Sequence, residues 1–355
     1  MFTLSDVKKS SGRLAASRCG LSLVVAHALG FAACVGDPPP PYSTPSSDGG
    51  TVSSDGATNG GGATNADGAT NGDGATPPCD LDAPFSAPAL VPGIDTPGNN
   101  EMLARLSSDE LTIYFTSDRA REHDGEPSID DRDIYVASRT KRTDRFGPPV
   151  RVAELTTPQS DSAPMLTPDG RTLFFESTRP GSSLHAIWVA TRTETGQFTD
   201  IRRLDSLDSV GDERAPFFSP ADDALWFGSN RHDPDRSYGI YRAKRNGADF
   251  EPPELVEELF TPDSHWFPVL SADGLTIYWG SNRADGGAKG DFDVWRARRS
   301  TTSDRFGPPE NVSELNTPSA ELPTWISPDG CRLYLQRRDE SERNSIYVAE
   351  KPPKM

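Results

Sequence analysis

Apolar and polar residues along this chain alternate in short runs, without the 3.6-residue period of amphipathic helices. The clearest runs share one pattern: a Ser or Thr, then Asp-Gly or a substitute, then several β-branched or aromatic residues. This pattern is typical of a tight turn that leads into a strand. It occurs five times, and its first residues, here called the anchors, are 60, 52, 52 and 56 residues apart: Ser107, Thr167, Ser219, Ser271 and Ser327. The spacing predicts a repeat protein.

A second apolar run follows each anchor segment and carries an aromatic residue at one fixed register. These runs are Ile134–Ala137, Ile187–Ala190, Ile240–Ala243, Val294–Ala297 and Ile346–Ala349. A segment of the Phe-x-Pro-Pro type comes next, and its prolines suit an edge strand. With the run that precedes each anchor, every unit supplies four short strands. Four-stranded units repeated radially are the blades of a β-propeller.

The two ends of the repeat region complete each other. Phe85 precedes the first anchor by 22 residues, and a Phe precedes each later anchor by 21, so the N-terminal segment is the same outer-strand element. The last unit stops after its third strand. The N-terminal element can therefore close the ring and leave no unpaired sheet edge. The predicted fold class is all-β, a five-bladed β-propeller over residues 79–351, with a six-bladed propeller as the alternative.

The first 78 residues have a different composition. Residues 1–34 begin with basic side chains and continue with an apolar stretch, which predicts an export signal peptide. Its end, Phe31-Ala-Ala-Cys34, resembles the lipobox of bacterial lipoproteins, so Cys34 is the predicted lipidation site, with simple cleavage as the alternative. Residues 35–78 are a low-complexity segment of Gly, Ser, Thr, Asp and Asn that cannot bury enough apolar area to fold. They are predicted to be a disordered tether.

Charge and cysteine content narrow the environment of the protein. The formal net charge of -17 disfavours nucleic acid as a partner. Export predicts a location in the periplasm or at the cell surface, with membrane attachment through the lipid anchor alone and the outer membrane as the expected site. In such an oxidising compartment Cys79 and Cys331, which fall in the same blade, can form a disulfide. Two buried free thiols are the alternative.

The repeat resembles a known family. The Ser-Pro-Asp-Gly turn, the Leu-Tyr-Phe run, the Ser-x-Arg after it and the Asp-Ile-Tyr-Val-Ala strand are similar to the TolB-like, WD-repeat-like propeller repeats of bacterial envelope proteins. The resemblance covers residues 85–350 and implies the fold. It implies no particular activity, because propellers host many unrelated functions. The repeats depart from the pattern in places: Ser219-Pro-Ala-Asp lacks the glycine, and Arg337-Arg-Asp replaces Ser-x-Arg.

A polar residue stands six positions before each anchor, at the start of the innermost strand. Innermost strands line the channel of a propeller, so these residues are candidates for a ligand-binding ring: Glu101, Asp161, Glu213, His265 and Glu321. Trp266 faces opposite to His265 and could flank the channel. The competing interpretation is structural, because four units carry an arginine twelve residues after the anchor that could pair with the acids. These are Arg119, Arg179, Arg231 and Arg283.

No catalytic triad or metal-ligand spacing is recognisable, so no catalytic residue and no enzymatic activity are predicted. Calcium is the one cofactor considered, because the loops Asp130–Asp133 and Asp285–Asp293 are acidic; pairing with arginine explains these acids equally. The predicted function is that of a monomeric cell-envelope lipoprotein that binds or scaffolds an envelope protein or glycan. The alternative is a glycan-active, glycosidase-like enzyme that uses channel carboxylates.

Overall fold

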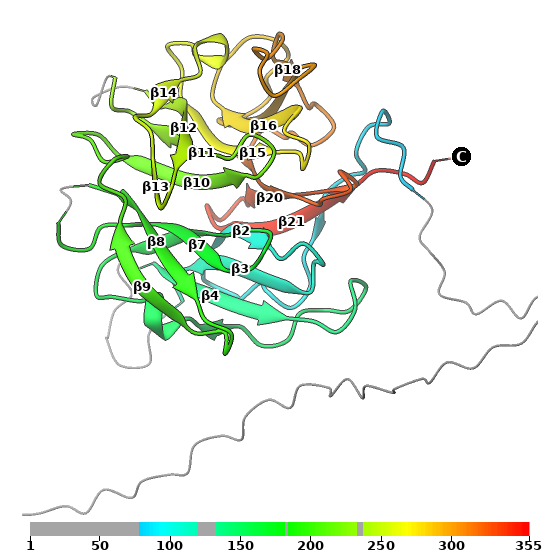
Figure 1. Cartoon of the computed structure of the whole chain (residues 1–355). Coiled ribbons are helices and arrows are strands. Elements are labelled where there is room, and N and C mark those ends of the chain that lie inside the picture. Colours follow the sequence, from blue (N-terminus) through cyan, green and yellow to red (C-terminus); the bar gives the residue numbers. More distant parts are fainter. Residues whose placement is uncertain (1–77, 120–131, 182–183, 233–236, 355) are drawn as a thin grey trace, which may run out of the picture. The chain divides into compact units, whose positions relative to one another are not determined.

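The computed structural model describes residues 78–119, 132–181, 184–232 and 237–354 (Figure 1). The predicted signal peptide, Cys34 and the predicted tether lie outside these ranges. Within them the strands form five antiparallel sheets, and the helical segments are two single 3-10 turns, η1 (Ala153–Leu155) and η2 (Glu257–Leu259). No helix in the described ranges is long and apolar enough to cross a membrane. The all-β prediction is confirmed.

Each sheet is one blade, and its strands follow one another outward from the centre. The innermost strands of blades 1 to 5 are β2 (Glu101–Leu106), β6 (Asp161–Leu166), β10 (Glu213–Ser219), β15 (His265–Leu270) and β19 (Glu321–Ile326). The second strands are β3 (Thr112–Ser117), β7 (Thr172–Ser177), β11 (Ala224–Ser229), β16 (Thr276–Ser281) and β20 (Arg332–Arg338). These ten strands are almost wholly buried, which explains their apolar runs.

The outer half of each blade is more exposed, and in four blades the outermost strands have two residues each. The third strands are β4 (Asp133–Ser138), β8 (Ala186–Arg192), β12 (Gly239–Asn246), β17 (Asp293–Arg298) and β21 (Asn344–Glu350). The outermost strands are β5 (Val150–Arg151), β9 (Phe198–Arg203), β13 (Asp249–Phe250) and β14 (Glu254–Leu255), β18 (Glu310–Asn311) and β1 (Ala89–Leu90). Blade 3 alone carries two short outer strands, both paired with β12. The five-bladed propeller is confirmed.

One detail of the outer strands differs from the prediction. The prolines of the Phe-x-Pro-Pro segments lie outside the strands, because proline has no N–H for the ladder. A two-residue strand follows each segment, as β5 follows Phe146, and in blade 3 the strand β13 also ends at Phe250. The phenylalanines instead pack into the core, with Phe146 1 % exposed. Only β9 begins at its Phe, in the unit where Asp200-Ile201 replaces the two prolines. The missing prolines thus allow a longer outer strand.

Neighbouring blades are joined by a repeated backbone hydrogen bond. The first residue of an innermost strand donates its N–H to a backbone carbonyl of the preceding blade. That carbonyl belongs to the residue directly before the third strand. The bonds are Asp161 to Arg132, Glu213 to His185, His265 to Tyr238 and Glu321 to Phe292, at 2.8–3.0 Å. Between blades 5 and 1 the Asn344 N–H donates to the Asn100 side chain instead. This contact fixes how each inner strand enters beside its neighbour.

The ring closes in blade 5, which both ends of the described chain build. β1 pairs with β21, so the strand order is β1-β21-β20-β19, as the displaced N-terminal segment predicted. In Figure 1 the red β20 and β21 lie beside the cyan β2, and contacts between these strands confirm that blades 5 and 1 are adjacent. The Cys79–Cys331 disulfide joins the two chain ends just before β20. The predicted cysteine pairing is confirmed.

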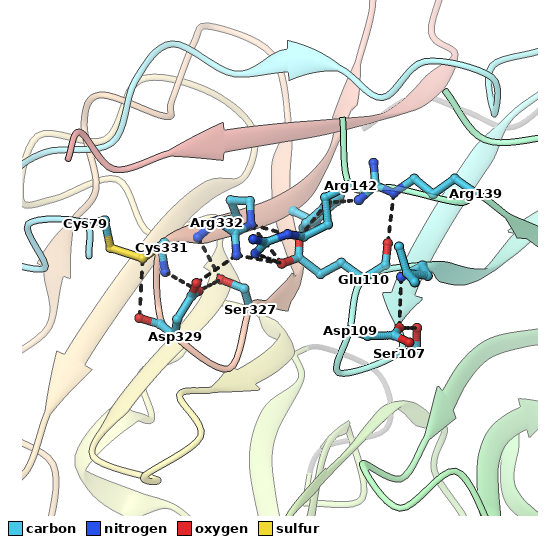
Figure 2. Close-up of polar contacts among 12 residues, drawn as sticks. Cys79, Ser107, Asp109, Glu110, Arg139, Arg142, Ser327, Asp329, Cys331 and Arg332 are labelled. Carbon is cyan, nitrogen blue, oxygen red and sulfur yellow. Dashed lines mark hydrogen bonds and ion pairs between the residues drawn. A yellow bond between two sulfur atoms is a disulfide. The ribbon is translucent and has the colours of Figure 1, made fainter. Parts of the chain in front are cut away.

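A buried glutamate completes the junction between blades 1 and 5 (Figure 2). Glu110 occupies the turn position where three other units have glycine, and its φ of 62° is left-handed. Arg332 of blade 5 holds the carboxylate with both Nε and Nη2, at 2.8 and 2.6 Å. Tyr334 donates a further hydrogen bond at 3.1 Å. These contacts compensate for an uncommon backbone conformation.

Candidate functional site

The predicted ring residues are at the start of the innermost strands, and all five are 0 % exposed. The four acids each contact an arginine of their own blade, at 2.7–3.1 Å: Glu101 with Arg119, Asp161 with Arg179, Glu213 with Arg231 and Glu321 with Arg337. Arg337 stands at the position of the Ser in the Ser-x-Arg motif and still reaches its acid. The structure therefore shows the carboxylates in intra-blade ion pairs. It does not bring them together as an open ring.

Each of these arginines also donates to a backbone carbonyl and lies over an aromatic ring. Arg179 donates to the carbonyl of Leu155 at 2.8 Å, and its guanidinium lies over the ring of Trp188, 5.0 Å from the centroid. The other blades repeat the aromatic contact with Tyr135, Tyr241, Trp295 and Tyr347. The fixed aromatic register of the third strand is thus the platform for the arginine. Such a set of contacts compensates a buried ion pair and fixes the register of the strands.

His265 is the exception in the ring. Its Nε2 contacts the N–H and hydroxyl of Thr261, while its Nδ1 has no partner among the described residues. Arg283, the arginine of the same blade, has no acid opposite it. Burial and the charge of Arg283 lower the pKa of His265 to about 4, so the imidazole is neutral at pH 7. Blade 4 therefore keeps the geometry of the ring without its ion pair.

The residues that do line the centre come from a β-bulge. The register of every innermost strand shifts after its second or third residue, as between Met102 and Arg105. In four blades the third residue is left-handed, with φ of 50–56°: Leu103, Ala163, Ala215 and Phe267. Their side chains and those of Met102, Leu322 and Trp266 form one central apolar cluster. Alternation along the strand therefore does not predict the channel lining.

A cavity of about 210 Å³ opens where the innermost strands begin. We call this end the polar mouth. Apolar walls come from Met102, Leu103, Trp266, Phe267, Phe292 and Leu322, and polar groups from Arg132, Glu176, Arg214, Gln336, Arg338 and Asn344. Of the predicted site residues, only Trp266 lines this cavity. Three of its polar groups are arginines, although the whole chain has a net charge of -17.

The carboxylates at the polar mouth share one arginine. Arg214 of β10 has Nη1 3.7 Å from Glu176 and Nη2 3.5 Å from Asp212. Glu176 also accepts hydrogen bonds from Ser162 and from the Ala215 N–H, both at 2.7 Å. Asp212 accepts from Tyr238 at 2.7 Å and contacts His185 Nδ1 at 3.2 Å. Burial would raise the pKa of Asp212, but these bonds and Arg214 hold it well below its usual range.

Aromatic rings form the opposite wall of the polar mouth. Trp266 packs against Tyr238, Phe267 and Phe292 with centroid distances of 4.8, 5.6 and 5.5 Å. Trp266 is half-buried, and its Nε1 has no hydrogen-bond partner among the described residues. The mouth therefore combines an aromatic wall with cationic and amide groups. This combination suits a ligand with both an apolar face and negative charge.

The acidic loops considered for calcium have protein partners where they are described. Asp293 accepts from the N–H groups of Lys289 and Gly290 and from the Asn311 amide, at 2.7–3.1 Å. Asp133 faces Arg151 at 3.5 Å. The described residues contain no cluster of three or more His, Cys, Asp or Glu side chains that could hold a metal ion. Asp130 and Asp131 lie outside the described residues.

Sequence reasoning missed most of the polar mouth. Arg132, His185, Tyr238, Phe292 and Asn344 stand at one equivalent position, at or just before the start of the third strand, and carry five different chemistries. Asp212 directly precedes the acid of the ring. The repeat alignment contained this signal, because a position that varies in chemistry between units cannot serve a purpose common to all blades.

Comparison with known proteins gives similarity of fold alone. No protein-family model matches the sequence, and no curated protein is recognisably related to it. TolB from Acinetobacter baumannii shares 16 % identity over 76 % of this chain and 56 % of its own, with a TM-score of 0.39. An alpha-L-arabinofuranosidase from Podospora anserina, solved with cellotriose, shares 11 % identity over 79 % of this chain and 99 % of its own, with a TM-score of 0.45. The catalytic domain of an alpha-L-arabinofuranosidase from Coprinopsis cinerea shares 11 % identity over 76 % of this chain and 98 % of its own, with a TM-score of 0.43.

One prediction is corrected by these similarities. The chain was predicted not to be an enzyme because its sequence has no recognisable catalytic constellation. Glycoside hydrolases are among the solved structures with similar architecture, so that conclusion was wrong as drawn. The physical reason is that a propeller brings catalytic groups together from separate blades, and no short sequence motif marks them.

Proposed function

We propose that the protein is a binding module that takes an anionic carbohydrate at the polar mouth. The observation that carries this proposal is the pairing of an aromatic wall with arginines in one cavity of an otherwise acidic protein. A sugar ring offers an apolar C–H face that packs on an aromatic side chain, and a uronic-acid carboxylate takes two hydrogen bonds from a guanidinium.

The arginines differ in what they can offer a ligand. Arg214 is committed to Glu176 and Asp212 and is partly exposed, so it serves as a fixed positive wall. Arg338 has 36 % of its side chain exposed, and among the described residues its ion pairs are with the exposed acids Asp291 and Glu342, at 3.7 and 3.3 Å. Surface pairs of this kind are weak and exchange readily for a ligand carboxylate. Arg338 is therefore the expected carboxylate anchor.

Binding of acidic oligosaccharides tests the proposal directly. Isothermal titration with oligogalacturonate is expected to show binding that Trp266→Ala and Arg338→Gln each weaken by roughly 10- to 100-fold, the equivalent of one lost charge-assisted or stacking contact. Arg305→Gln is the matched control, because Arg305 is 76 % exposed and outside the mouth. Equal binding of neutral oligosaccharide, or unchanged binding in both mouth variants, would contradict an anionic-sugar site.

Hydrolysis at the same mouth is the second candidate function. The specific observation is the pair of carboxylates, Glu176 and Asp212, held on the two terminal nitrogens of Arg214. Paired carboxylates are the groups that glycoside hydrolysis uses. Release of reducing ends from acidic glycans, lost in Glu176→Gln and Asp212→Asn, is the expected result. A wild-type protein that binds the glycan and leaves it intact would remove this candidate.

We also propose that the propeller is an exported lipoprotein that acts as a monomer, tethered through Cys34 by residues 35–78. The Cys79–Cys331 disulfide supports an oxidising compartment. The repeat resemblance to envelope proteins supports the same location. Intact mass of the mature protein is the test: diacylated Cys34 is expected at its N-terminus, and Cys34→Ala is expected to release the protein from the membrane. Retention of residues 1–33 would overturn this assignment.

A further inference from the structure

The channel has a second cavity at the end opposite to the polar mouth. It measures about 230 Å³ and is surrounded by the sixth residues of all five innermost strands, Leu106, Leu166, Phe218, Leu270 and Ile326. The rim consists of the residues that follow the anchors, of which three are prolines. We call this end the apolar mouth. Its walls offer hydrocarbon contact from every direction.

One charged side chain belongs to the strand position that borders the apolar mouth. The fifth residues of the innermost strands form a ring of Arg105, Met165, Phe217, Val269 and Trp325, and three of these line the cavity. Arg105 belongs to blade 1, yet its guanidinium lies 5.3 Å from the ring centroid of Phe217 in blade 3. The guanidinium of blade 1 therefore lies against a side chain of blade 3 that lines the cavity. Phe217 is both cavity wall and platform for this cation.

Arg105 lacks the partners that the buried arginines Arg179 and Arg299 have. It is 3 % exposed, it makes no hydrogen bond or ion pair with any described residue, and its Nη1 is buried without a partner. Burial lowers the pKa of Arg105 to about 9, although the charge of Glu176 opposes this shift. By contrast, Arg179 is bonded to an acid, a hydroxyl and a carbonyl. A buried cation with its donors unused is suited to an anionic ligand.

From these observations we propose that the apolar mouth binds an aliphatic carboxylate, with its carboxylate on Arg105 and its hydrocarbon chain between the blade ends. The apolar lining determines the hydrocarbon part of this ligand, and Arg105 determines its carboxylate. At roughly 30 Å³ per methylene, close to the volume share of a water molecule, the cavity admits a chain of about eight carbons. The site is separate from the polar mouth and does not depend on the function proposed there.

Titration with octanoate tests the assignment. Binding is expected in the wild-type protein and is expected to weaken by roughly 10- to 100-fold in Arg105→Met and Arg105→Gln, because a charge-assisted hydrogen bond is lost. Lengthening the chain from hexanoate to octanoate is expected to raise affinity about fourfold per methylene, with no further gain beyond the cavity. Octanol, which has the same chain without the charge, is expected to bind as weakly to the wild type as octanoate binds to Arg105→Met.

Two results would overturn the proposal. Equal affinity for octanol and octanoate would show that Arg105 does not bind the carboxylate. Affinity that continues to rise at the same rate through dodecanoate would place the chain outside the cavity. Arg105→Met is expected to remain folded, because it removes a buried charge that has no partner. The comparison of ligands on the wild-type protein holds even if that variant fails to fold.

Discussion

The first and second positions of the innermost strand are neighbours in sequence and have opposite characters. The first carries Glu, Asp, Glu, His and Glu, and its acids pair within their own blades. The second carries five different residues: Met102, Ser162, Arg214, Trp266 and Leu322. A residue type that repeats in every blade serves a structural role that every blade requires. Chemistry that differs around the ring can recognise a ligand that has no five-fold symmetry.

Breaking one ion pair of the repeated position should give the largest effect. Asp161→Asn leaves Arg179 buried without its counter-charge, which is expected to lower the free energy of unfolding by about 3–5 kcal/mol. Urea denaturation measures this change. The matched control is Asp205→Asn, which removes an exposed partner of Arg203 and should cost about 1 kcal/mol or less. Equal costs at the two sites would show that the ring contributes no more than a surface pair.

The disulfide occurs in one blade and is nevertheless expected to stabilise the fold. It therefore tests whether features that differ between blades serve ligand binding alone. Cys79 and Cys331 are 252 residues apart, and reduction is expected to cost about 2–5 kcal/mol through the unfolded chain. Thermal unfolding with and without reductant measures the loss. The double variant Cys79→Ser with Cys331→Ser should unfold at the same temperature in both conditions. An unfolding temperature of the wild type that does not change with reductant would show that the disulfide adds no stability, and ring closure would then rest on contacts such as that of Glu110 with Arg332.

His265 predicts a pH dependence of stability opposite in sign to that of Glu101 and Glu213, whose pKa values are raised by burial. Its pKa is about 4 in the folded state, set by burial and by Arg283, against about 6.5 when unfolded. The unfolded state therefore binds more protons between these values, and stability that is complete above pH 6.5 falls as the pH approaches 4, by about 3 kcal/mol. Chemical denaturation across this window measures the slope. His265→Gln should reduce it, and an unchanged slope in that variant would assign the effect to other groups.

Restoring an acid in blade 4 should have the smallest effect. His265→Glu places a carboxylate opposite Arg283, as in the other blades, but the desolvation of a buried pair offsets most of its attraction. The free energy of unfolding at pH 7 is expected to stay within about 1 kcal/mol of the wild-type value in urea denaturation. A loss as large as that of Asp161→Asn would mean that the five first positions are not structurally equivalent.

Much of the fold was predictable because its physics is local and repeated. Turn residues, strand periodicity and the spacing of Phe85 sufficed to count the blades and to place the closing strand. The disulfide followed from that count. The acid–arginine pairing was also predictable, because both members repeat at fixed distances from the anchors.

The site was less predictable because it depends on geometry that the sequence does not display. The bulge after Met102 rotates the third residue of the strand toward the centre, against simple alternation. The contact of Arg105 with Phe217 crosses the ring and exists only when all five blades are closed. Arg105 was nevertheless visible as the only charged residue in an otherwise apolar fifth position. Odd members of a repeat position therefore merit the closest attention.

The closure of blade 5 has a mechanical consequence. Any pull on the chain before Cys79 meets the Cys79–Cys331 disulfide before it reaches β1. That bond transfers the load to the edge of β20, a strand paired on both sides within its blade. Force on the N-terminal side is therefore taken up by a covalent bond and spread across a sheet, and the two-residue β1 is shielded from being peeled away.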